Sequence, residues 1–331
     1  MRVTLKDVAE KAHVNVSTVS RALNNSGYVM PETKQRILQA VEELSYRPNL
    51  LLRNMRKGKR FTIGLIVPSI HLSLFGEIAQ AIMEELNEKD YETLLSITFD
   101  NPAIESQALN RLRNGLIDGI IIAGTGRNNT LIRDIQAEGI PILQIVRNQD
   151  DCLPAIVGDY EKTAIEGVKF LHEKGCQGIA FINGTENIGP FEERLKGYKV
   201  GMRSIRQRRI LPNSREKNDY FQDGYRLCNE ILDGVQMVDG IMVSTDFIAL
   251  GVYRSIKEHG FKVPWDIRLI SLTGHQIGEQ LETSLTSMEL PAIKMGKKAA
   301  RLLIEMIEED KDVRNNVYVF DSILVEREST E

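Results

Sequence analysis

The stretch DVAEKAHVNVSTVSRALNN, from Asp7 to Asn25, decides how the N-terminal end of the chain folds. Thr4 is a good N-cap with Asp7 three residues on, which predicts a first helix over 4–12. After a turn at 13–15, Asn15 can cap a second helix over 16–23. Pro31 suits the first turn of a third helix. Its buried face is expected to carry four apolar side chains: Ile37, Leu38, Val41 and Leu44. Two short helices joined by a tight turn and braced by a third form a helix-turn-helix, whose second helix enters the major groove of DNA.

The charge of the chain is divided unevenly along its length. Residues 1–60 hold 12 lysines and arginines against five acidic residues, although the whole chain of 331 residues has a net charge of −4. The other 271 residues therefore carry −11. A basic head on an acidic body indicates that the head meets a polyanion and that the body has another task.

The head resembles the signature of the LacI/GalR family of bacterial transcription regulators. The resemblance rests on Asp7 to Asn25, continues through Tyr46-Arg47-Pro48-Asn49, and extends over nearly the whole chain. It implies a homodimer that binds a near-palindromic double-stranded DNA operator, controlled by a small effector.

The resemblance also implies roles for single residues of the head. Val16 and Ser17 stand where the second helix reads bases, and Arg21 suits guanine. Short polar groups would bond phosphates and set the register. The expected DNA-binding residues are Thr4, Val16, Ser17, Thr18, Ser20, Arg21, Asn24, Tyr28, Asn49 and Met55.

Residues 49–57 would form a hinge helix that is short, basic and marginally stable alone. In the family two such helices pair in the minor groove and wedge apolar side chains into a central base step. Leu is usual at the wedge position, where this chain has Met55.

After Arg60, short Val/Ile/Leu runs alternate with amphipathic helices, which predicts an α/β body of parallel sheets built from βαβ units. Leu109 to Thr125 parallels Cys228 to Asp246, so we expect two similar lobes with a cleft between them. This matches the two-lobed, periplasmic-binding-protein-like core, with parallel sheets flanked by helices, that the resemblance implies. The expected domains are 1–48 (head), 49–60 (hinge) and 61–331 (core), with lobe one at 61–159 and 291–323 and lobe two at 160–290.

The resemblance places the effector site in this cleft. Leu72, Leu74 and Phe75 follow the first strand, and Arg194 belongs to an R-x-x-G motif with Gly197. Each could instead be ordinary core or a surface ion pair, and either Tyr220 or Phe221 could point inward. His275 could equally be a surface group. The expected effector-binding residues are Leu72, Leu74, Phe75, Arg147, Arg194, Tyr220, Phe221, Thr245, Asp246, Thr273 and His275.

Two family carboxylates that accept bonds from sugar hydroxyls are replaced, by Val146 and Thr273. With Arg147 and Arg194 retained, the sequence favours a sugar or sugar phosphate effector, the phosphorylated form slightly.

Several classes of protein are disfavoured. Apolar runs fall far short of the ~20 residues of a membrane span, and the charged start MRVTLKDVAEK argues against export. Three widely spaced cysteines are expected to be small buried residues in a reducing compartment, so we expect a cytoplasmic protein. No metal-ligand spacing or catalytic motif is found, and Gly124-x-Gly126 lacks a third glycine. We therefore expect neither a cofactor nor enzymatic activity.

The sequence thus predicts a transcriptional regulator, a repressor of a carbohydrate-utilisation operon. The alternatives are a cytosolic ligand-binding protein without operator specificity and a regulator that responds to a non-sugar effector such as a purine. In the dimer, a helix over 75–89 with Ile78, Ile82 and Met83 is a candidate contact surface, unless it packs on its own sheet. An effector would shift operator affinity only through unequal affinity for two states.

Overall fold

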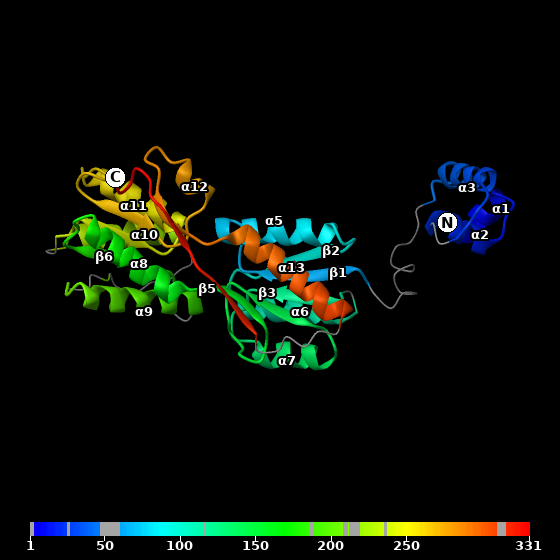
Figure 1. Cartoon of the computed structure of the whole chain (residues 1–331), viewed down its shortest axis with the longest axis horizontal. Helices are drawn as coiled ribbons and strands as arrows, with labels where there is room; N and C mark the ends of the chain where they lie inside the picture. The colour runs from blue at the N-terminus through cyan, green and yellow to red at the C-terminus, as the bar shows by residue number, and fades with distance from the viewer. Residues whose placement is uncertain are drawn as a thin grey trace. The chain divides into compact units, whose positions relative to one another are not determined.

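The computed structural model describes residues 3–24, 27–46, 60–115, 117–185, 188–207, 211, 219–234, 237–309 and 316–331 (Figure 1). The chain forms two compact units, Met1–Arg60 and Phe61–Glu331. The predicted hinge over 49–57 lies outside the described residues.

The described residues of the first unit form three packed helices, α1 (Leu5–Lys11), α2 (Val16–Asn24) and α3 (Pro31–Glu43). The predicted capping box is present at Thr4. The Thr4 backbone N–H donates to Asp7 Oδ2 at 2.7 Å, and the Asp7 N–H donates to Thr4 Oγ1 at 3.4 Å. His13 adopts a positive φ of 54° in the turn before α2.

Apolar faces of the three helices meet in one small core. Val8, Val19 and Ile37 are fully buried. The expectation that Leu38 is buried is wrong, because its side chain is 50% exposed. One residue of helix is a rotation of about 100°, so Leu38 leaves the face on which Ile37 lies.

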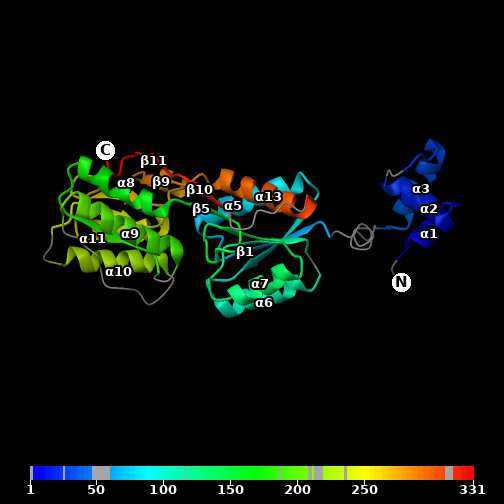
Figure 2. The ribbon, with the colours of Figure 1, turned by 60° about the horizontal axis from the view of Figure 1, so that its bottom comes forward.

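Lobe one of the second unit contains a six-stranded sheet in the order β10-β5-β4-β3-β1-β2, in which every pair is parallel. The strands are β1 (Thr62–Val67), β2 (Glu92–Ile97), β3 (Gly119–Ile122), β4 (Ile142–Ile145), β5 (Ala155–Gly158) and β10 (Val317–Phe320). Helices α5 (Ser73–Asn87) and α13 (Ala292–Glu308) cover one face, and α6 (Pro102–Arg113) and α7 (Asn129–Ala137) cover the other (Figure 2). Strands buried on both faces explain the apolar runs of the sequence.

Lobe two repeats the plan with a sheet in the order β11-β9-β8-β7-β6, of which only β11 runs antiparallel. Its strands are β6 (Ile179–Ile182), β7 (Gly240–Val243), β8 (Arg268–Ser271), β9 (Thr286–Glu289) and β11 (Ile323–Val325). Helices α8 (Tyr160–Glu173) and α9 (Gly189–Ser204) cover one face, and α10 (Tyr220–Leu232) and α11 (Asp246–Glu258) cover the other. A short helix, α12 (Gln276–Glu279), follows β8.

The chain crosses between the lobes three times, from β5 to α8, from β9 to α13 and from β10 to β11 (Figure 1). The last crossing brings residues 323–330 back to lobe two. The sequence analysis placed residue 323 at the end of lobe one and assigned the residues after it to neither lobe. There the Ser329 N–H donates to the Ser284 carbonyl at 2.9 Å, and the Leu269 N–H donates to the Ser329 carbonyl at 3.1 Å. The C-terminal segment is therefore part of the lobe-two sheet region.

Two sequence expectations about packing are corrected. Ile78 and Ile82 are fully buried in the core of their own lobe, so they do not form a surface for a second chain, whereas Met83 is 38% exposed. Of the three cysteines, Cys176 and Cys228 are buried as expected, but Cys152 is exposed, and all three are free thiols.

Candidate functional site

Helix α2 presents a polar face away from the core of the first unit. Val16, Ser17 and Arg21 are exposed, and the Arg21 Nε donates to the Ser17 carbonyl at 3.4 Å. On the opposite face Val19 and Ala22 are buried. One face of α2 therefore packs on the core, and the exposed residues of its first turn remain accessible to a binding partner.

The remaining DNA-binding candidates are placed less uniformly. Thr18 and Ser20 are half-buried, and Tyr28 is 84% exposed. The Thr4 side chain is engaged as the N-cap of α1. Asn49, Met55 and the side chain of Asn24 lie outside what the structure describes.

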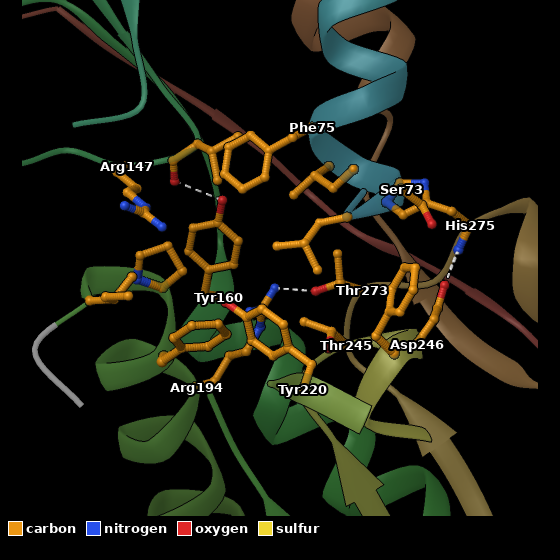
Figure 3. A pocket seen from close by; sticks show the side chains of 17 residues that line it. Ser73, Phe75, Arg147, Tyr160, Arg194, Tyr220, Thr245, Asp246, Thr273 and His275 are labelled. Carbon is orange, nitrogen blue, oxygen red and sulfur yellow. Dashed lines mark hydrogen bonds between the residues drawn. The ribbon is translucent and has the colours of Figure 1, made fainter. Parts of the chain in front are cut away.

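A cavity lies between the two lobes of the second unit (Figure 3). The empty space between its walls, together with the solvent-open space at its mouth, amounts to about 540 Å³. Its wall is mostly apolar and aromatic, with a few polar groups. The lining residues are Leu72, Ser73, Leu74, Phe75, Val146, Arg147, Tyr160, Ile188, Pro190, Phe191, Arg194, Tyr220, Thr245, Asp246, Phe247, Thr273 and His275.

Ten of the eleven expected effector-site residues line this cavity. Phe221 is not among the lining residues and is 38% exposed, whereas its neighbour Tyr220 is a lining residue. The choice that the sequence left open between these two aromatics therefore falls on Tyr220.

Arg147 enters the wall from the end of β4 and is already paired. Its Nη2 donates to Asp100 Oδ2 at 3.1 Å, and its Nη1 donates to the Gly124 carbonyl at 3.2 Å. The Arg147 side chain is 4% exposed, and its Cζ lies 5.9 Å from the centroid of the Phe75 ring. Asp100 neutralises this cation, a partner that the sequence analysis did not foresee.

Arg194 on α9 is a buried cation with no carboxylate in an ion pair with it among the described residues. It donates to Thr273 Oγ1 and, at 3.4 Å, to the Leu272 carbonyl. Its Cζ lies 4.7 Å from the centroid of the Tyr160 ring and 5.9 Å from that of Phe191. Burial lowers the pKa of Arg194 to about 10. The alternative of a surface ion pair is therefore wrong, because the side chain is only 2% exposed.

Asp246 and His275 form the lobe-two end of the cavity. The His275 backbone N–H donates to Asp246 Oδ2 at 3.0 Å. Burial raises the pKa of Asp246 to about 6. His275 is 5% exposed, so the alternative of a surface group is wrong, and its Nδ1 lies 3.1 Å from Glu77 Oε2 on α5 of lobe one.

Three of these residues keep a buried polar atom for which the described part of the chain supplies no hydrogen-bond partner: Arg194 Nε, Asp246 Oδ1 and His275 Nε2. A buried polar atom without a partner costs free energy. One donor-capable nitrogen and two acceptor-capable atoms at one cavity indicate a polar ligand that completes their bonding.

The sequence analysis missed most of the aromatic wall. Tyr160 begins α8 directly after the first crossing, and its hydroxyl donates to the Val146 carbonyl at 2.8 Å (Figure 3). Phe191 lies three residues before Arg194, and this helical spacing could have placed both on one face. Phe247 follows Asp246 at the start of α11. Val146 itself has a φ of 66°, which is strained for a β-branched residue and is found at functional sites.

The described residues hold no helix both long and apolar enough to cross a membrane. In the same part of the chain, no three or more His, Cys, Asp or Glu side chains gather as a metal site.

Comparison with known proteins agrees with both units. Residues 4–49 match the lacI family of bacterial regulatory proteins, and residues 168–330 match the periplasmic binding protein-like domain. A ribose operon repressor of Halalkalibacterium halodurans is 29% identical over 327 residues, covering 99% of this chain and 97% of the relative. Catabolite control protein A of Priestia megaterium is 29% identical over 317 residues, 94% of each chain.

Solved structures show the same architecture. The lac repressor dimer bound to operator and the anti-inducer ONPF has a TM-score of 0.86 at 24% identity, covering 100% of this chain and 99% of that chain. A periplasmic binding protein/LacI transcriptional regulator from Alkaliphilus metalliredigens, complexed with D-xylulofuranose, has a TM-score of 0.73 at 27% identity, covering 82% and 99%. With its N-terminal helix-turn-helix and its two-lobed core, the chain belongs to the LacI family of bacterial transcriptional regulators.

Proposed function

We propose that this regulator is a cytoplasmic, homodimeric repressor of a carbohydrate-utilisation operon, released or retained on DNA by a small effector in the interlobe cavity. The observation that carries the proposal is the cavity itself, with aromatic walls and three buried polar atoms lacking partners among the described residues. Aromatic faces suit the apolar face of a sugar ring, and the polar atoms suit its hydroxyls.

On the DNA side, we propose that Val16, Ser17 and Arg21 contact base edges. All three are exposed on one face of α2. A bidentate contact of Arg21 with guanine O6 and N7 would contribute about 1–3 kcal/mol of discrimination. Thr18 and Ser20 would bond phosphates and set the register.

The arrangement of charges favours a neutral sugar over a sugar phosphate. The sequence analysis favoured the phosphate because Arg147 and Arg194 both lie near the cavity. Arg147 is paired with Asp100, however, which leaves Arg194 as the cation available to a ligand, and the Asp246 carboxylate would repel a dianion.

Dimerisation is proposed to use the exposed side of α5 rather than its buried isoleucines. A groove there is lined from lobe one by Ile70, Met83 and Leu95 and from lobe two by Ile277 and Gln280. Because the groove spans both lobes, a change in the angle between lobes would alter its shape. An effector that prefers one angle would then shift the dimer and its DNA affinity.

Selection of bound duplexes by the full-length protein, followed by a salt series, tests the DNA side. We expect one near-palindromic site to bind at least about 1,000-fold more tightly than random duplex. Equal affinity for all duplexes would favour the ligand-binding alternative, and removal of residues 1–60 must abolish specific binding.

Calorimetry of the full chain tests the effector. We expect binding of a neutral sugar among D-ribose, D-xylulose and sucrose, weaker binding of D-ribose 5-phosphate, and no turnover of either. Binding of a purine alone would contradict the carbohydrate assignment.

A further inference from the structure

One contact beside the cavity joins the two lobes. His275, which precedes α12 in lobe two, places its Nδ1 3.1 Å from Oε2 of Glu77, which lies on α5 in lobe one. The side chain of His275 is 4% exposed and that of Glu77 is 31% exposed. The pair is therefore shielded from solvent on the histidine side.

This contact decides what the other ring nitrogen can do. A neutral imidazole has one N–H, and a carboxylate can only accept, so the proton lies on Nδ1. Nε2 then becomes an acceptor, and it is buried with no partner in the described residues.

Asp246 presents a second acceptor at the same end of the cavity. One of its carboxylate oxygens accepts from the His275 backbone N–H at 3.0 Å, while Oδ1 lacks a partner among the described residues. Two neighbouring acceptors require a ligand edge that carries two donors. Sugar hydroxyls donate, whereas a fully ionised phosphate has no proton to give.

We propose that His275 is a specificity-determining residue that accepts a hydrogen bond from an effector hydroxyl through Nε2, and that its bond to Glu77 transmits occupancy of the cavity to α5. The inference rests on the proposed carbohydrate effector. Ser73 lines both the cavity and the α5 groove, and Glu77 lines the groove. The His275–Glu77 pair thus lies in the wall between the ligand site and the proposed dimer surface.

Two replacements of His275 separate the two roles. In His275→Asn the amide nitrogen falls near the position of Nδ1 and can still donate to Glu77, but the ligand acceptor is gone. In His275→Gln the amide oxygen falls near the position of Nε2 and can still accept from a hydroxyl, but the bond to Glu77 is lost. Glu77→Met keeps the approximate length of the side chain and removes the oxygens that accept from His275.

The control is Glu88→Met, which makes the same change at an exposed position capping the C-terminus of α5. Glu88 lies eleven positions after Glu77, about 16 Å along the helix axis. It lines neither the cavity nor the groove.

The experiment measures two quantities on the full-length protein: the Kd for the neutral sugar that binds the unmodified chain best, and the coupling ratio, which is the operator Kd with saturating sugar divided by that without it. We expect His275→Asn to raise the sugar Kd about tenfold and also to reduce the coupling, because the sugar no longer contacts the residue that is bonded to Glu77. His275→Gln should keep the sugar Kd within about threefold and reduce the coupling at least fivefold, as should Glu77→Met. Glu88→Met should change neither.

Equal sugar affinity of the Asn and Gln variants, or an unchanged coupling ratio in Glu77→Met, would overturn the inference. A second readout needs no sugar: in long-range ¹⁵N–¹H spectra of the histidine-labelled protein, the ring signal that disappears in His275→Gln should report a protonated Nδ1 and a bare Nε2. A protonated Nε2 would also overturn it. If none of the sugars binds the unmodified chain, the carbohydrate effector fails instead, and the ring spectrum still decides the role of the pair.

Discussion

Replacing Arg194 by methionine should separate the function of this residue from its contribution to stability. Arg194 is a buried cation, only 2% exposed. In the described part of the chain it is stabilised by hydrogen bonds and aromatic rings, and it forms no ion pair with a carboxylate. Methionine has a similar length, is apolar, and adapts to an irregular space. The variant removes the charge without leaving a large void.

The magnitude follows from the pKa of the guanidinium, which burial lowers from 12.5 to about 10. Each pKa unit corresponds to about 1.4 kcal/mol, so the charged form costs about 3 kcal/mol in this site at every pH below about 10. The cost disappears only as the pH rises towards 12.5. Loss of the hydrogen bonds to the Leu272 carbonyl and Thr273 offsets about 2 kcal/mol of the relief. Arg194→Met should therefore stabilise the core by about 1 kcal/mol, or about 2 °C in Tm.

The assay combines thermal and urea unfolding at pH 7 with calorimetry of sugar binding. The control is Arg203→Met, the same change at an exposed position of α9, which should alter stability by less than about 0.5 kcal/mol. Sugar binding should be lost in Arg194→Met and retained in the control. A Tm that falls by more than about 3 °C, or a sugar Kd within threefold of the unmodified chain, would refute the reasoning.

Three further variants test the core and the head. Asp246→Asn should raise the unfolding free energy by about 2–3 kcal/mol at pH 7, because burial raises the pKa of this carboxyl from 3.8 to about 6. The gain should vanish below pH 4, where the carboxyl is protonated in both the folded and the unfolded state. Urea unfolding at the two pH values measures this, and an equal gain at both would contradict it. Gly197→Ala should destabilise the core by about 2–4 kcal/mol in the same assay, because the new Cβ would meet a backbone oxygen of α8 at 2.1 Å, whereas Gly189→Ala, with its nearest heavy atom at 3.9 Å, should be neutral. Ile37→Ala should lower the unfolding free energy of the head by about 2–5 kcal/mol and abolish operator binding in a gel-shift assay without changing sugar binding. If the exposed-site variant Leu38→Ala also lost operator binding, the loss would point to a direct DNA contact on α3 instead.

Local signals were enough to predict the head and the order of elements in the core. The capping box at Thr4 and the proline at the start of α3 depend on residues within one helical turn of each other. Apolar runs likewise locate strands that are buried on both faces. The prediction that Leu38 is buried was wrong because a hydrophobic residue next to buried Ile37 in the sequence was assumed to lie on the same face of the helix.

The cavity could be predicted in part, from residues that follow strand ends. Partners from other elements could not. Asp100 reaches Arg147 from a loop 47 residues away, and Glu77 reaches His275 from the other lobe. The first pair depends on the strand order of the lobe-one sheet and the second on how the two lobes are placed, and no local pattern encodes either. For that reason the sequence suggested two available cations in the cavity where the structure leaves one.

The three crossings between the lobes are short, with one residue between β5 and α8 and two residues in each of the other two. Links of this length act as a hinge. The two lobes can rotate about the line through the three links, but the links are too short to let the lobes slide apart or twist against each other. The third link leads into β11, which pairs with β9, so a chain cut just before Ile323 would keep every residue that lines the cavity but would lose one of the three links together with the edge strand of the lobe-two sheet.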